Sequence, residues 1–221
     1  MVALTILGFV LLVTFGVFRL GLSAWEKGES SREGFQKMRV TIQLLSQQIK
    51  SLMPYKIKSQ KAEGDFLAFE GRTRSLKFVS TLSLTTRRPS GFVYVYYEFQ
   101  GGAGTGGRLV QYERRVVNKN FLEEIPPEQD KVPLFDGLAD VTFEYYQEED
   151  PQKTRSAGWL GEWNAKDEKE LPRAIRIILV PQKREGTGEE PPIVILASLP
   201  STRYEELSSE PARTTAAAVT R

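Results

Sequence analysis

The sequence contains no cysteine and no histidine. The lack of cysteine excludes disulfide bonds and thiolate nucleophiles. Without either residue, the usual zinc ligand sets and histidine-based proton transfer are excluded as well. Most common enzyme mechanisms therefore have no residues to perform them, and we expect no catalytic site, no cofactor and no metal.

An excess of charge of one sign is also lacking. The 221 residues include 30 Lys and Arg against 28 Asp and Glu, a formal net charge of +2. Proteins that bind nucleic acid usually concentrate an excess of Lys and Arg on one face or in one segment. The sequence has no such segment, so we expect no nucleic-acid partner.

Residues 1–18 carry no charge, and Arg19 follows them. This apolar run predicts a membrane-spanning helix, although a bilayer core needs about 20 helical residues and the run is at the short end of that range. A cleaved signal peptide would instead begin with positive charge and end in a small-residue cleavage site. A buried core helix would have to be apolar on all sides. We expect the following residues to contact lipid or neighbouring helices: Ile6, Phe9, Val10, Val13 and Val17.

The helical pattern continues beyond Arg19, because no proline occurs before Pro54. In this second part, apolar residues recur at spacings of three and four, as in an amphipathic helix. The apolar stripe consists of Phe35, Met38, Ile42, Leu45, Ile49 and Leu52. We favour packing of the stripe on the protein's own sheet, and a seam against partner helices remains the alternative.

The rest of the chain is rich in short alternating segments, which predict antiparallel strands bounded by Gly, Pro and Asp. The expected strands are residues 65–70, 75–80, 92–99, 109–117, 141–146, 174–180 and 193–199. Segment 92–99 is apolar on both faces, which favours a central position. Val141, Phe143 and Tyr145 define the core-facing side of a half-exposed strand. Segment 148–170 is expected to be a loop, with Trp159 and Trp163 covering the core, and a contact with a partner remains the alternative.

These patterns predict an α+β fold in which one long N-terminal helix precedes antiparallel sheets. We expect a transmembrane part at 1–20, an amphipathic part of the same helix at 21–53, a β-rich domain at 54–200, and a polar, disordered tail at 201–221. Gly102, Gly104 and Gly107 match a dinucleotide-binding spacing. A strand-like segment follows them instead of a helix, so they predict a hairpin loop.

This order of parts resembles that of type IV pilins and pseudopilins. Particular strings are similar to those of the minor pseudopilin J family of type II secretion. They are VALTILGFVLLVTFGVFRLGLSAWEKGE at the N-terminus, then LVQYERR, PLFDGLADVTFEYY, a loop with two tryptophans, and LPRAIRIILV. The resemblance extends to about Leu199.

The resemblance implies a type IV pilin-like fold, anchored in the cytoplasmic membrane with its globular domain in the periplasm. It also implies a place at the pseudopilus tip, where the protein helps to initiate assembly for export across the outer membrane. The implied partners are the minor pseudopilins of types I and K, with type H as a further candidate, and the major pseudopilin. The alternatives are a minor pilin of another type IV filament and a periplasmic binding protein held by a single span.

Family members carry a short basic leader and a peptidase cleavage site ahead of a string like MVALTILG. This sequence begins within that string, so we expect the natural start to lie upstream, and the cleavage and methylation site to lie outside this chain. Arg19, Lys27 and Arg32 alone would place the globular part in the cytoplasm. A basic leader on the other side of the apolar run would reverse that orientation.

Overall fold

The computed structural model describes residues 2–57, 65–85, 91–101, 106–117, 121–150, 155–183 and 190–199. Side chains are not described at residues 3, 4 and 20–35. The chain divides into two compact units, with the division between Gln43 and Leu44. The domain boundaries expected after residues 20 and 53 stay predictions, and the tail at 201–221 lies outside the described residues.

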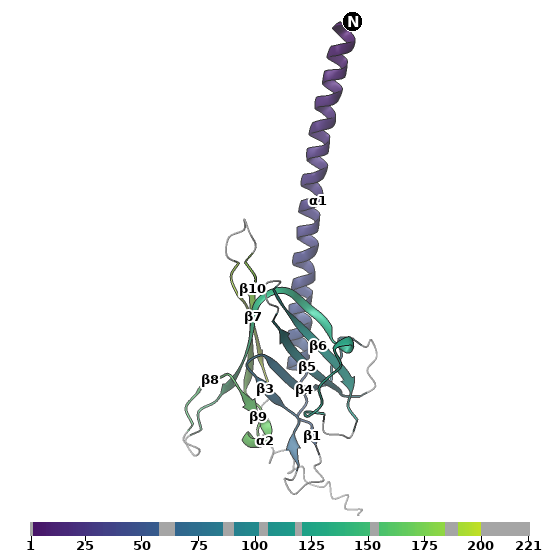
Figure 1. Ribbon diagram of the computed structural model, residues 1–221. Coiled ribbons are helices and arrows are strands. Elements are labelled where there is room, and N and C mark those ends of the chain that lie inside the picture. The colour runs from purple at the N-terminus through teal and green to yellow at the C-terminus, as the bar shows by residue number, and fades with distance from the viewer. Residues whose placement is uncertain are drawn as a thin grey trace, which may run out of the picture. The chain divides into compact units, whose positions relative to one another are not determined.

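A single α-helix, α1, runs from Val2 to Lys50 and is 49 residues long (Figure 1). The expected long N-terminal helix is thereby confirmed. The helix ends where the N–H of Leu52 bonds to the main-chain oxygen of Ile49 at 3.0 Å, and Leu52 then forms a bridge to Ser80. The membrane span expected at 1–20 is not found: no helix among the described residues has the length and apolar character needed to cross a bilayer.

Within the described residues, nine strands form one sheet in the order β11-β10-β7-β6-β5-β4-β3-β9, and β8 pairs with β7 outside this path. The strands are β3 Glu70–Arg72, β4 Ser75–Ser80, β5 Val93–Gln100, β6 Gly107–Arg115, β7 Val132–Gln147, β8 Gly158–Leu160, β9 Trp163–Asn164, β10 Ala174–Pro181 and β11 Ile193–Ser198. A separate small sheet pairs β1 Lys56–Ile57 with β2 Phe66–Leu67. Two short helices, η1 Glu128–Asp130 and α2 Ala165–Glu168, complete the elements. All the pairings are antiparallel, which confirms the α+β class.

Strand β5 lies between β4 and β6, which confirms its predicted central position. Val95 and Tyr97 are buried on one face, and Tyr94 is buried on the other. Tyr94 belongs to a second cluster that includes Phe121, at a ring-centroid distance of 4.3 Å. Strands β5 and β6 are antiparallel neighbours from Gln100↔Arg108 onward. The loop predicted from Gly102 and Gly104 lies outside the described residues.

Strand β7 is longer than predicted. The sequence indicated a strand only at 141–146, whereas β7 is 16 residues long and curves across the sheet (Figure 1). Its first part pairs with β6 through register shifts, and its second part pairs with β10. The predicted core face is confirmed, because Val141, Phe143 and Tyr145 are fully buried.

The prediction of a loop over residues 148–170 was wrong, because the structure places β8, β9 and α2 within this segment. Trp159 of β8 lies opposite Tyr146 of β7, and Trp163 of β9 lies opposite Gly71 of β3. Trp163 is buried, as expected, and Trp159 is half-buried. These elements are too short to show a period in the sequence, so the pairing with distant strands defines them.

The sheet curls until β3 and β7 meet. The Tyr145 hydroxyl donates a hydrogen bond of 3.1 Å to the main-chain oxygen of Arg72. The Tyr145 ring lies where a Cβ on Gly71 would be, so only glycine fits at that position without displacing the ring. This contact closes the core between strands that are far apart in the sequence.

Candidate interaction surfaces

Exposed apolar side chains cover the first part of α1. The five residues selected from the sequence, Ile6, Phe9, Val10, Val13 and Val17, are between 47% and 71% exposed. Full burial of one such side chain contributes about 1.5–3 kcal/mol. Covering this surface with lipid or with another helix would therefore be strongly favourable.

The hydroxyl groups in this apolar part bond to the helix itself. Thr5 donates to the main-chain oxygen of Val2 at 2.7 Å, and Thr14 donates to that of Val10 at 2.8 Å. A hydroxyl that donates its hydrogen bond within its own helix can lose contact with water without leaving this donor unpaired. Neither threonine therefore opposes burial of this surface in an apolar environment.

The apolar stripe of α1 differs along its length. Leu45, Ile49 and Leu52 are buried in the globular unit, Met38 and Ile42 are half-buried, and the side chain of Phe35 lies outside the described residues. Beside the stripe, Val40 and Leu44 are 54% and 40% exposed. The end of the stripe is thus part of the protein's own core, while neighbouring positions remain available to a partner helix.

A buried polar group, Gln48, joins the end of α1 to the sheet. Its amide nitrogen donates to the main-chain oxygen of Leu82 at 2.8 Å and to Glu113 Oε1 at 2.5 Å. Its amide oxygen accepts hydrogen bonds from the Tyr97 hydroxyl and from Gln111 Nε2. Both donors and both acceptor positions of the amide are used, so the burial of Gln48 leaves no polar atom unsatisfied. We call Gln48, Tyr97, Gln111 and Glu113 the Gln48 cluster.

Glu113 connects the Gln48 cluster to the segment after β4. It accepts hydrogen bonds from Ser83 Oγ at 2.6 Å, Thr85 Oγ1 at 2.6 Å and the Leu84 N–H at 2.8 Å. Burial alone would raise the pKa of Glu113, but these bonds and the one from Gln48 outweigh burial and lower the pKa below its ordinary value. Glu113 is therefore ionised at neutral pH.

Tyr97 stays protonated at neutral pH. Burial, and after it the charge of Glu113, raises the pKa of Tyr97 well above its ordinary value. Neither Tyr97 nor Glu113 changes its protonation state near pH 7. The Gln48 cluster therefore suits an anchor between helix and sheet better than acid–base chemistry.

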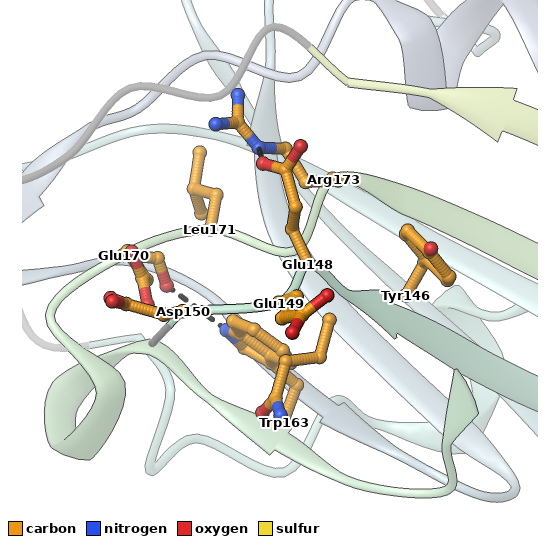
Figure 2. Close-up of a pocket in the computed structure, with 9 residues that line it drawn as sticks. Tyr146, Glu148, Glu149, Asp150, Trp163, Glu170, Leu171 and Arg173 are labelled. Atoms are coloured by element: carbon orange, nitrogen blue, oxygen red, sulfur yellow. Dashed lines mark hydrogen bonds and ion pairs between the residues drawn. The ribbon is translucent and has the colours of Figure 1, made fainter. Parts of the chain in front are cut away.

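A small pocket lies beside Trp163 (Figure 2). Its acidic lining residues are Glu148, Glu149, Asp150 and Glu170. Glu148 pairs with Arg173 at 2.6 Å, and the Trp163 indole N–H donates to the main-chain oxygen of Glu170 at 3.0 Å. The cavity volume of about 30 Å³ is far below that of pockets for organic ligands, roughly 300–1,000 Å³. No group of acidic side chains among the described residues has the geometry of a metal site.

Comparison with known protein families identifies the class of protein that has these features. The family model of type II secretion system (T2SS) protein J matches residues 16–187. The chain belongs to this family. No curated protein and no solved structure matches it at a significant level.

Membership in the T2SS protein J family confirms the resemblance to the minor pseudopilin J. The family consists of structural components of the secretion system, and it assigns a pseudopilin role to the chain. Such a component works through surfaces that meet other pseudopilins.

Sequence reasoning overlooked the Gln48 cluster. Gln48 had a detectable signal, because it lies three residues after Leu45 and four before Leu52, on the side of the helix that carries the apolar stripe. A polar residue at such a position predicts a buried hydrogen-bonding partner. Glu113 had no comparable signal, since its donors at 83–85 belong to a distant segment.

Proposed function

We propose that this protein is a minor pseudopilin at the tip of the pseudopilus, where it helps to initiate the filament that exports proteins across the outer membrane. Family membership supports the pseudopilin role. The single observation that carries the assembly role is the exposed apolar surface of α1 between Val2 and Phe18.

The physical argument concerns what covers this surface. An apolar helix that leaves lipid must be covered again, and packing beside related helices does so while each helix keeps its own backbone hydrogen bonds. In this proposal, the apolar part of α1 lies in the cytoplasmic membrane before assembly and among other helices afterwards. The globular unit lies in the periplasm, in a type IV pilin-like arrangement.

The proposed partners are the minor pseudopilins of types I, K and H and the major pseudopilin. Val40 and Leu44 support helix-to-helix contact beyond the N-terminal part, because both are exposed apolar residues on α1. Burial of Val40 or Leu44 against a partner helix would add to the contact made by residues 2–18.

The test introduces charge into the apolar surface, with Val13→Leu as the matched control. Val13→Lys should abolish secretion in cells that carry the remaining secretion genes, whereas Val13→Leu should support it. A charge at the bilayer centre costs about 2.5–3.5 kcal/mol on insertion scales, so part of the variant should remain in the membrane fraction. Normal secretion by Val13→Lys would contradict the proposal and favour a membrane-anchored binding protein.

The initiating role has a separate measurement. In cells that overproduce the major pseudopilin, deletion of this protein should lower the number of filaments and leave their length unchanged. If deletion instead shortened the filaments as much as it lowered their number, the protein would have a role in elongation.

A further inference from the structure

Strand β11 is an open edge of the sheet within the described part of the chain. It pairs with β10 in consecutive antiparallel pairs from Leu179↔Ile193 to Ala174↔Ser198, without a register shift. At the end of this ladder, the Leu199 N–H donates to the main-chain oxygen of Arg173 at 2.8 Å. Hydrogen bonding in such a ladder alternates from residue to residue. The backbone groups of Val194, Leu196 and Ser198 therefore point away from β10.

Two of these three residues also present exposed apolar side chains. Val194 and Leu196 are 56% and 55% exposed, while Ile195 and Ala197 between and beside them are buried in the core. At these positions β11 thus combines exposed apolar side chains with backbone groups that have no strand partner among the described residues.

Inside β11 there is no Lys, Pro or bulge, which are features that often protect sheet edges, although Pro191 and Pro192 directly precede the strand. Residues 193–198 read IVILAS and pair regularly with β10. At the opposite end of the strand order, β9 has only two residues and continues directly into α2. Strand β11 therefore offers a longer edge for pairing than β9 does.

The outer face beside Leu196 has the composition of a protein-binding surface. Leu196 lies opposite Arg176, whose guanidinium stacks on the Trp159 ring at 4.2 Å. Trp159 in turn lies 5.2 Å from Tyr146, measured between ring centroids. Trp, Tyr and Arg are the residues most enriched at energetic centres of interfaces.

Charge on this face indicates what kind of partner fits. Arg176 forms an ion pair with Glu144 at 2.5 Å, so its charge is balanced without an acidic residue from a partner. The free backbone donors and acceptors repeat along an extended chain, and only another extended chain can pair with them along its length. The occupant is therefore an extended strand, with apolar side chains where it covers Val194 and Leu196.

We propose that β11 is a docking edge to which a neighbouring pseudopilin adds a strand, with its apolar side chains over Val194, Leu196 and the Trp159–Arg176 stack. This inference rests on the proposed function, because assembly supplies the partner. The interface would extend subunit contacts from α1 to the sheet.

The first experiment places a photo-cross-linking amino acid in the full-length protein, in cells that produce the whole secretion system. The positions are Leu196, Val10 on α1, and Ile125, which is 89% exposed and serves as the control. At Leu196 and Val10, mass spectrometry should identify another pseudopilin as the second component of the adduct, and Ile125 should give none.

The other outcomes separate the two proposals. Pseudopilin adducts at Val10 without any at Leu196 would overturn the docking edge and leave the proposed function intact. Their absence at both positions would contradict the proposed function itself. An adduct of two copies of this chain at Leu196 would replace the proposed partner with self-association.

The second experiment tests backbone pairing, with the cross-linker at Ser198. Leu196→Pro removes an outward N–H and retains the bonds of Ile195 and Ala197 to β10, while Leu196→Ala removes only the side chain. The Ala variant should keep part of the adduct yield, and the Pro variant should lose it, at similar melting temperatures in detergent. Equal yields would overturn strand addition. Should Leu196→Pro fail to fold, Val194→Lys must abolish the adduct, and an unchanged yield would overturn the docking edge.

Discussion

The side-chain amide of Gln48 on α1 donates a hydrogen bond of 2.5 Å to the carboxylate of Glu113 on β6. The bond crosses from helix to sheet and joins the buried Gln48 to the half-buried Glu113. Glu113 also accepts from Ser83 and Thr85, so the same carboxylate holds the segment that follows β4. The Gln48 cluster thus adds polar contacts to the apolar packing of Leu45 and Ile49, which also holds the last turns of α1 on the sheet.

Replacing Gln48 with Leu should destabilise the fold. The Tyr97 hydroxyl and the Gln111 amide would lose a buried partner, and each unsatisfied buried group costs about 1–3 kcal/mol. Gln47→Leu is the matched control, because Gln47 is exposed one position away, and its effect should stay within about 0.5 kcal/mol. Denaturant titration of both variants measures the difference, and equal stabilities would contradict a structural role for the Gln48 cluster.

Glu113→Gln should show a pH-dependent effect. The pKa of Glu113 is lower in the folded state than its ordinary value of 4.5, so ionised Glu113 stabilises the fold fully above that pH. This contribution decreases as the pH falls below 4.5 towards the folded-state pKa. The melting-temperature gap between wild type and Glu113→Gln should therefore be largest at neutral pH and narrow below about pH 4.5. A gap of the same size at every pH would contradict the role given to ionised Glu113.

Truncations should separate the two parts of α1. Removing residues 1–20 should give a soluble protein that unfolds cooperatively, because the buried hydrophobic core begins at Leu45. Removing residues 1–50 deletes Leu45, Gln48 and Ile49 and should abolish cooperative unfolding. Circular dichroism during heating distinguishes the two, and a sharp transition in residues 51–221 would show that α1 is dispensable for the core.

Gly71→Ala should lower stability by roughly 1–3 kcal/mol, the usual cost of overpacking. The added Cβ would overlap the Tyr145 ring, and the ring is held by its bond to the Arg72 carbonyl. Gly158→Ala is the control, because a Cβ there meets no atom within 4 Å. A thermal shift for Gly158→Ala as large as that for Gly71→Ala would assign the effect to the loss of glycine itself.

Strict alternation made much of the sheet predictable. Val141, Phe143 and Tyr145 were recognisable as a core face, whereas β5 was located because residues 92–99 are apolar on both faces. The first part of β7 was not predictable, because Pro133 and Gly137 are disfavoured in strands and its pairing with β6 is a tertiary effect. For the interaction surfaces, the sequence indicated the apolar residues of α1. The position of β11 at the end of the described sheet depends on strand order, which alternation does not encode.

The contact between β3 and β7 also affects how the chain reaches its folded state. The Tyr145–Arg72 bond joins residues 73 positions apart, and the bond from Thr73 to Gly161 spans 88. Contacts this distant in sequence slow folding, because a long loop must close before they form. When the chain emerges N-terminus first, the edge of β3 that pairs with β9 stays exposed until Trp163 follows. Because β3 has three residues, it offers other chains only a short edge for non-native pairing. We therefore expect the contacts between β3, β7 and β9 to form late in the folding of this chain.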